Sequence, residues 1–294
     1  MKINEIKCKT AINKLSKSRL PYSLDLNIYR GCSHKCSYCY ALYSNSYLGS
    51  TDFFNEIFVK KNIIEVLEKE LRKKKDDKII NMGSVTDAYQ PLEEKYGLMR
   101  EVLKLMIKYN QPIIISTKSD LILRDIDLIE KLSRKTYVNI ASTITVMDER
   151  IRKLIEPYSK SSIQRINMLK EIEKTNANTA IHMMPIIPYI TDSIENIDKI
   201  FYLGKQINID YILTGPLNLR GQTRSYFLNF IKKNFSEEYK KIEKLYESSS
   251  ILNKEYLTNL NRKIYSIRKK YNISSNYMKK INEHYNNIEQ LSLF

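Results

Sequence analysis

The chain has 294 residues, 43% of them hydrophobic, and a formal charge of +16 from 49 basic and 33 acidic residues. This length can bury a large core, and no apolar run approaches the roughly 18 residues of a membrane-spanning helix. The N-terminus lacks the apolar stretch of a secretory leader, and four cysteines are too few for a disulfide framework. We therefore expect a cytoplasmic protein with no membrane partner.

Short apolar runs rich in β-branched residues alternate with longer amphipathic stretches along most of the chain. The expected strands are 23–29, 78–82, 111–117, 137–144, 179–184 and 210–214. The expected helices lie near 61–74, 95–109, 123–134, 162–175 and 193–206. Alternation of this kind indicates βαβ units and a parallel sheet. It predicts an α/β fold that closes as a partial (β/α)6 barrel of the TIM type.

The barrel is expected to occupy residues 22–222, after an N-terminal segment of residues 1–21. Residues 223–294 read as a C-terminal extension of long, polar helices. From residue 220 onward the chain has 15 basic against 7 acidic side chains, interleaved with tyrosines such as Tyr265 and Tyr271. This pattern favours contact with DNA. Codon usage rich in A and T, indicated by abundant Lys, Asn, Ile and Tyr, is an alternative source of the lysine excess.

The most specific motif is the group Cys32, Cys36 and Cys39, spaced C-x3-C-x2-C. Four thiolates would close a zinc site or occupy every iron of a [4Fe–4S] cluster, whereas three leave one iron open to a substrate or cofactor. The alternatives are a zinc knuckle completed by His34 or Cys8, and buried free thiols. No fourth ligand stands at knuckle spacing, which favours the cluster.

The sequence around the cysteines continues into further motifs that follow the expected strands, where the chemistry of parallel barrels gathers. In chain order they are Y-R-G-C-S-H-x-C-x-Y-C-Y, G-x-V-T-D-x-Y-Q-P, T-K-S-D, L-x-E-P and P-I-I-P. Over residues 22–235 the chain resembles the radical S-adenosylmethionine (SAM) superfamily, in its spore photoproduct lyase-related branch. The resemblance implies a [4Fe–4S] cluster on the three cysteines, bound SAM, a 5′-deoxyadenosyl radical and a reductant such as flavodoxin or ferredoxin.

The same resemblance implies roles for side chains near the strand ends. Lys118 would bind the SAM carboxylate, and Gly83 would admit the SAM amino group. The other expected SAM contacts are Tyr38, Tyr40, Thr86 and Ser142. In the thymine-dimer enzyme of this branch, a cysteine in the second-strand loop returns a hydrogen atom to the product, and Ser84 stands there in this chain. The O–H bond of a serine is too strong for that role, and a tyrosine such as Tyr89 is the expected relay instead.

The last five residues, Gln290, Leu291, Ser292, Leu293 and Phe294, resemble the peptide by which bacterial repair proteins bind the DNA sliding clamp. The alternative is a terminal helix that folds back on its own domain.

Together these features predict a radical SAM enzyme that acts on a DNA base lesion of the pyrimidine photoproduct kind. Radical modification of a peptide or small molecule is the first alternative. A non-catalytic, metal-dependent nucleic-acid-binding module is the second.

Overall fold

A computed structural model describes residues 1–15 and 22–291, with side chains through residue 286. Its main sheet has seven strands in the order β10-β9-β8-β7-β6-β3-β2. From β3 to β10 neighbouring strands are parallel and follow the chain order, and β2 forms an antiparallel edge with β3. The strands are β2 (Ile12–Lys14), β3 (Leu24–Leu26), β6 (Ile80–Met82), β7 (Ile113–Thr117), β8 (Val138–Thr143), β9 (Asn178–Ile186) and β10 (Tyr211–Pro216).

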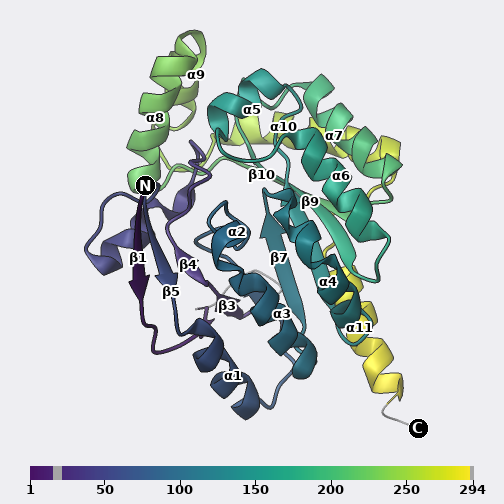
Figure 1. Ribbon diagram of the computed structural model, residues 1–294. Coiled ribbons are helices and arrows are strands. Elements are labelled where there is room, and N and C mark those ends of the chain that lie inside the picture. The colour runs from purple at the N-terminus through teal and green to yellow at the C-terminus, as the bar shows by residue number, and fades with distance from the viewer. Residues whose placement is uncertain (16–21, 292–294) are drawn as a thin grey trace.

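The six parallel strands confirm the predicted α/β fold, and helices cover their outer face (Figure 1). These helices are α1 (Ile63–Lys73), α2 (Glu93–Tyr96), α3 (Leu98–Lys108), α4 (Ile126–Ser133), α6 (Ser162–Glu173) and α7 (Ile194–Gln206). Helix α5 (Glu149–Ile155) lies at the C-terminal ends of the strands, where Ile155 packs with Cys36 and Tyr38. Two 3-10 helices, η1 (Tyr40–Leu48) and η2 (Asp120–Asp125), follow strand ends.

The first expected strand was wrong in its extent. Residues 23–29 divide into β3 and the start of β4 (Tyr29–Arg30), which leaves the main sheet. β4 joins β5 (Glu56–Lys60) and β1 (Lys2–Ile6) in a second, three-stranded sheet. β1 is mostly exposed and polar, so it lacks the apolar pattern by which the buried strands were recognised.

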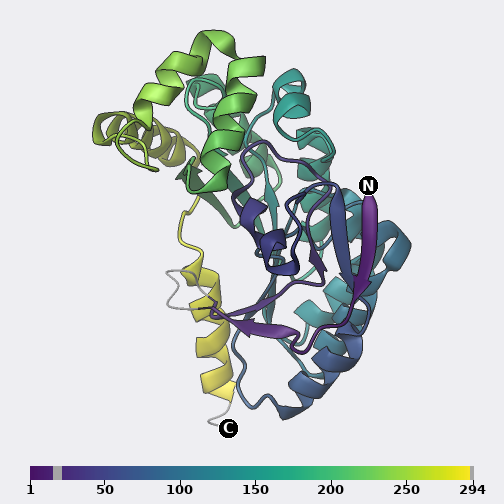
Figure 2. The ribbon, with the colours of Figure 1, turned by 90° about the vertical axis from the view of Figure 1, so that its left-hand side faces the viewer.

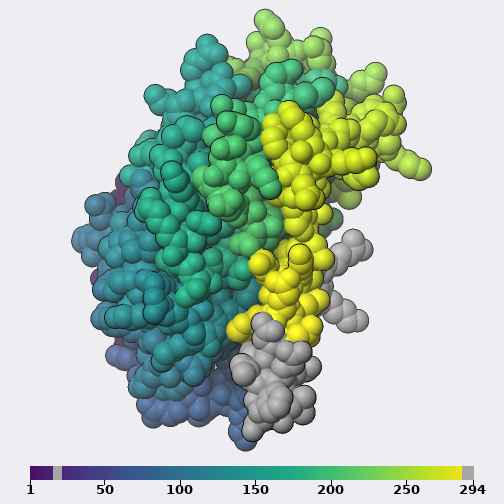
Figure 3. All heavy atoms as spheres, turned by 90° about the vertical axis from the view of Figure 1, so that its right-hand side faces the viewer, coloured from purple at the N-terminus to yellow at the C-terminus, as the bar shows by residue number. Residues whose placement is uncertain are grey.

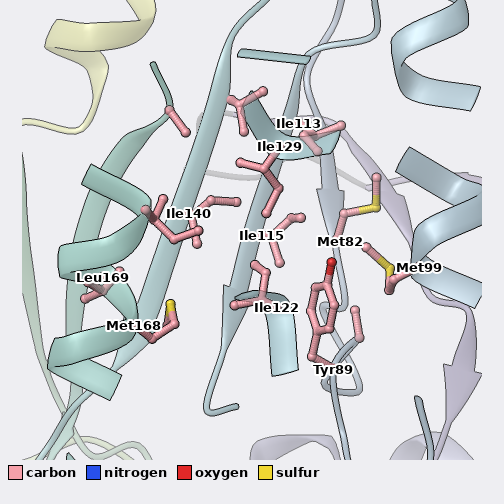
Figure 4. Packing of buried hydrophobic residues seen from close by; sticks show 14 of the residues in the cluster. Met82, Tyr89, Met99, Ile113, Ile115, Ile122, Ile129, Ile140, Met168 and Leu169 are labelled. Atoms are coloured by element: carbon pink, nitrogen blue, oxygen red, sulfur yellow. The ribbon is translucent and has the colours of Figure 1, made fainter. Parts of the chain in front are cut away.

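The hydrophobic core fills the space between the main sheet and its helices (Figure 4). Side chains alternate between the two faces of each strand. Met82, Ile113, Ile115 and Ile140 point into this core, whereas Asn81, Ile114 and Ala141 have the opposite parity and face the barrel interior.

Four helices follow the barrel: α8 (Gln222–Asn234), α9 (Ser236–Leu245), α10 (Lys254–Tyr271) and α11 (Met278–Leu291). Helices α8 and α9 rise beside the C-terminal ends of the strands (Figures 1 and 2), and α10 packs on α7. Figure 3 shows the last two helices lying along the barrel.

Helix α11 lies beside the N-terminal ends of the barrel strands. Tyr285 donates a hydrogen bond to the carbonyl of Asp77 (2.9 Å), which precedes β6, and Lys280 pairs with Asp210 (3.4 Å), which precedes β10. The N-terminal ends of the strands are thus covered by the C-terminal extension. No helix in the described part of the chain is both long and apolar enough to span a membrane.

Candidate active site

Cys32, Cys36 and Cys39 lie in one loop after β4, at the C-terminal ends of the barrel strands. The loop begins at Gly31, whose φ of +78° suits glycine and whose missing Cβ would lie 2.6 Å from the carbonyl of Glu56. The loop is also held by backbone hydrogen bonds, including that from Ser37 to Ile155 (2.8 Å). The backbone is therefore fixed around the three thiols.

All three cysteines line a cavity of about 520 Å3, a volume typical of small-molecule sites. The cavity extends from the cysteine loop down the barrel interior to α11. Its other lining residues include Tyr22, His34, Tyr38, Tyr40, Phe53, Asn81, Gly83, Ser84, Thr86, Asp87, Ile114, Ser116, Lys118, Thr143, His182, Met184, Tyr211, Leu213, Gly215, Asn218, Tyr277 and Ile281.

The loop after β6 ties the cysteine loop in place. Thr86 donates its hydroxyl hydrogen to the carbonyl of Gly31 (2.6 Å), and the buried side chain of Gln90 bonds the same carbonyl and the amide of Ser33 (3.3 and 3.0 Å). The sequence analysis expected Thr86 to bind SAM. Its side chain lines the cavity, and its hydroxyl hydrogen holds the cysteine loop.

Asp87 is the central link of this region. Its Oδ2 accepts from His34 Nε2 (3.1 Å) and the amide of Lys118 (2.8 Å), and its Oδ1 accepts from Thr117 and the amide of Tyr89. Burial alone would raise the pKa of Asp87, but His34 and the other donors outweigh burial and lower it to about 2. An ionised carboxylate thus joins three strand-end loops.

The residues fit a [4Fe–4S] cluster better than zinc. Both ring nitrogens of His34 are engaged, by Asp87 and by the carbonyl of Tyr158 (3.1 Å), and Cys8 lies away from the cavity, paired with Asn62. Among the described residues no three His, Cys, Asp or Glu side chains are placed to hold one metal ion. The three thiolates of a cluster bind three different irons and need not converge on one point.

Burial raises the pKa of each of the three thiols to about 12. A metal centre with positively charged irons is what would stabilise them as thiolates in so apolar a place.

Lys118 is the single lysine or arginine among the described residues that line the cavity. Burial alone would lower its pKa, but Cys36, Glu156 and Asp87 outweigh burial and raise it. Its ammonium lies 5.8 Å from the ring centre of Tyr38. This position beside the cysteines would suit a carboxylate ligand, and the role of Lys118 in binding SAM stays a prediction.

Tyr38 lines the cavity with its ring, while its hydroxyl donates to the buried Glu156. Glu156 also pairs with the fully buried Arg165 at 2.5 Å. This pair anchors the aromatic residue that lies between two of the cysteines.

Gly83, Tyr40 and Ser84 also line the cavity. Gly83 has a φ of +84°, and a Cβ there would lie 2.7 Å from the carbonyl of Thr86. Tyr40 donates a hydrogen bond to the carbonyl of Ser84. The Ser84 hydroxyl in turn donates to Asp25 (2.5 Å).

Two predicted site residues point elsewhere. Ser142 faces the helical side of β8 and donates to the carbonyl of Thr117 (2.8 Å), and its neighbour Thr143 lines the cavity instead. Tyr89 lies in the main core (Figure 4), and its hydroxyl bonds Asp125 (3.2 Å). Its position argues against a relay of hydrogen atoms into the cavity, because its side chain is not among the lining.

Four lining or supporting residues were missed by the sequence analysis or given no role there. Asp25 and Asn81 are polar residues in buried strands, a signal that was overlooked. Ser116 contacts His182 (Oγ to Nδ1, 3.2 Å) in the barrel interior. The structure places His182 in the lining of the cavity.

The expected clamp-binding peptide is only partly described. Gln290 and Leu291 belong to the end of α11, and Ser292, Leu293 and Phe294 lie outside the described residues.

Comparisons with known proteins agree with this geometry. The model of the family described as Radical SAM superfamily matches residues 26–201. Uncharacterized proteins of Mycobacterium tuberculosis and Methanocaldococcus jannaschii are 28% and 31% identical over 93% and 82% of this chain, and over 82% of their own length in each case. The structure is similar to spore photoproduct lyase (TM-score 0.65, 12% identity, 92% of this chain and 79% of the other). It is also similar to SuiB of Streptococcus suis, solved with the precursor peptide SuiA (TM-score 0.53, 15% identity, 87% and 48%).

Proposed function

Because the chain belongs to the radical SAM superfamily, whose members use a [4Fe–4S] cluster and SAM, we propose that it is an enzyme that modifies a base lesion in DNA. The observation that carries the proposal is the shared cavity of three cysteines and Lys118. When bound, the cluster and SAM would supply a 5′-deoxyadenosyl radical. We propose residues 22–222 as the catalytic core and residues 223–294 as an extension that binds DNA.

The protein's own residues would hold and shield these groups. Cys32, Cys36 and Cys39 would bind the cluster, and Lys118 would bind the SAM carboxylate. Asp87 would keep the cysteine loop and the Lys118 loop at a fixed spacing through its bonds to both. The ring of Tyr38 and the glycine surface of Gly83 would form the wall against SAM.

Support for DNA as the substrate comes from charge and aromatic residues. The chain carries +16, and lysines stack on tyrosines in the loops and helices near the strand ends. Lys35 lies 5.2 Å from the ring of Tyr158, and Lys232 lies 5.8 Å from that of Tyr239. The likeness to spore photoproduct lyase agrees with such a substrate.

Ser84 makes the route of hydrogen return different from that of a cysteine-dependent lyase. Its hydroxyl hydrogen is directed at Asp25, which favours binding over hydrogen-atom transfer. The proposed partners are a flavodoxin or ferredoxin as reductant and the sliding clamp, bound through residues 290–294.

A peptide substrate is the second candidate, favoured by the likeness to SuiB.

The test is anaerobic reconstitution with iron and sulfide, followed by reduction with SAM deuterated at C5′. We expect 5′-deoxyadenosine to form and deuterium to exchange with an ultraviolet-irradiated oligonucleotide, and both to disappear in Cys36→Ala. A protein that cleaves SAM but exchanges deuterium only with peptides would overturn the DNA assignment. Stoichiometric binding of zinc without cleavage of SAM would overturn the assignment of the protein as an enzyme.

A further inference from the structure

The end of helix α5 lies directly over the cysteine loop. The amide of Ser37 donates a hydrogen bond to the carbonyl of Ile155 (2.8 Å), and the Ile155 side chain packs with Cys36 in one buried cluster. The amide of Tyr158 donates to the carbonyl of His34, also in the loop (3.4 Å). Figure 1 shows α5 at the end of the barrel to which the strands point. The cysteine loop is therefore joined to the end of α5 by direct contacts.

The other side of this segment is open to solvent. Leu154 is 43% exposed and Tyr158 is 58% exposed, and Lys153 and Pro157 are exposed as well. Lys35 of the cysteine loop joins them, because its ammonium lies 5.2 Å from the ring centre of Tyr158. We call these five residues the α5 face. None of them lines the cavity, so this face approaches the cysteines from outside the substrate chamber.

The charge of the α5 face is positive but sparse. Within the described part of the chain Lys35 and Lys153 form no ion pair, whereas nearby Arg150 and Lys160 are each paired with an aspartate. Two unpaired lysines beside an apolar centre suit a small contact with an acidic protein. DNA is the competing occupant, but its backbone carries a charge at every phosphate and is bound by more cations than this face offers.

We propose that the α5 face is the docking surface of the electron donor, a small acidic protein that carries single electrons. The inference rests on the proposed function, because it locates the reductant that radical SAM enzymes need. Acidic side chains of the carrier pair with Lys35 and Lys153, and apolar groups around its redox centre cover Leu154 and Tyr158. One electron leaves the reduced carrier and enters the cluster on the three cysteines, and no proton or chemical group is transferred.

The rate of cluster reduction tests the proposal. The reconstituted protein is mixed anaerobically with an excess of reduced flavodoxin or reduced [2Fe–2S] ferredoxin, and the EPR signal of the reduced cluster is followed by rapid freeze-quenching. In Lys153→Glu we expect the second-order rate constant to fall about fivefold or more at low salt, and the difference to vanish at high salt. Dithionite needs no docking surface and should reduce both proteins equally fast.

Two further variants separate the docking contact from general effects of charge. Lys69→Glu is the matched control, because Lys69 is exposed on α1 at the opposite end of the barrel (Figure 1) and the net charge changes equally. Its rate constants should equal those of the wild type. Leu154→Ser removes an exposed apolar group without changing charge, so it should slow reduction by the carrier about threefold at every salt concentration.

Carbodiimide cross-linking gives a second measurement that does not depend on activity. This reagent joins a lysine amine to a carboxylate, and mass spectrometry identifies the peptides that are joined. We expect the carrier to be linked to peptides that contain Lys35 or Lys153. In Lys153→Glu the yield of the Lys35 link should fall, because the carrier binds more weakly.

Equal rate constants of Lys153→Glu and the wild type with both carriers, or cross-links only to residues 222–286, would overturn the proposal. An oligonucleotide that protects Lys35 and Lys153 from cross-linking would also overturn it, because the face would then belong to DNA. If carriers reduce the cluster through this face but deuterium never exchanges with DNA, the proposed substrate is wrong and the docking surface stands. If deuterium exchanges while Lys153→Glu behaves like the wild type, the docking surface alone is wrong.

Discussion

Asp87→Asn should loosen the site by disconnecting its loops. The carboxylate accepts four hydrogen bonds, and a carboxamide can keep at most the pair on its oxygen while it turns an N–H2 towards the donors of the other pair. Each bond to a charged group contributes about 1.5–3 kcal/mol. The loss of two such bonds, partly offset by relaxation, predicts a fall of about 3 kcal/mol in the free energy of unfolding.

Urea unfolding and iron content after reconstitution are the two measurements. We expect the unfolding midpoint to fall and the iron bound per chain to drop, because His34 lies in the cysteine loop and loses its partner. Asp148→Asn is the control: Asp148 caps α5 from the surface, and asparagine caps as well as aspartate. If Asp87→Asn unfolds and binds iron like Asp148→Asn, the loops are held together by something other than Asp87.

Three further changes test the site and its supports. Gly31→Ala should lower the free energy of unfolding by about 3 kcal/mol or more, because a Cβ would lie 2.6 Å from the Glu56 carbonyl and the backbone would be strained. Gly49→Ala, also at positive φ but with no atom within 4 Å, should lower it by about 1 kcal/mol. Equal urea midpoints of the two variants would contradict this. Arg165→Met should lower the free energy of unfolding by about 3–5 kcal/mol, since it leaves the buried Glu156 without its ion-pair partner. Arg134→Met removes an exposed ion pair and should change the urea midpoint little. A small loss of stability in Arg165→Met would show that Glu156 finds another partner or takes up a proton. Burial, with a smaller contribution from Lys118, lowers the pKa of His182 from 6.5 to about 4. Between these pH values the unfolded chain binds more protons than the folded chain, so the free energy of unfolding should fall by about 2 kcal/mol from pH 7 to pH 5. His182→Gln should remove that part of the pH dependence, and an unchanged slope in urea titrations would refute it.

The barrel strands were predictable because each is a short, buried, β-branched run between amphipathic helices. Residues 113–117 and 138–143 illustrate this, since both strands are covered on both faces and, apart from Asn139, their residues are apolar or small. The cysteine loop was equally clear, because ligand spacing is local in sequence. The second sheet was missed, because β1 is exposed and its partner β5 lies some fifty residues away.

The wrong predictions at the site concern the direction in which side chains point. A strand places successive side chains on opposite faces, so an error of one residue exchanges the cavity for the core. Ser142 was chosen where Thr143 faces the cavity, and Tyr89 was chosen although its loop turns it into the core. Neither parity nor loop direction can be read from the residue types alone.

Asp25 shows what the structure adds to the sequence motif after β6. That motif places Ser84 beside the cysteines, where its O–H bond is too strong for hydrogen-atom transfer. In the structure the same hydroxyl completes the donor set of Asp25, and Asp25 in turn orients Asn81. A thiol at position 84 would be a weaker hydrogen-bond donor to this carboxylate. Ser84→Cys should therefore lower the free energy of unfolding by about 1 kcal/mol, measured by urea unfolding, even if the new thiol supplies hydrogen atoms. An unchanged unfolding midpoint would show that Asp25 is held by its other donors, Asn27 and Asn81, without the serine.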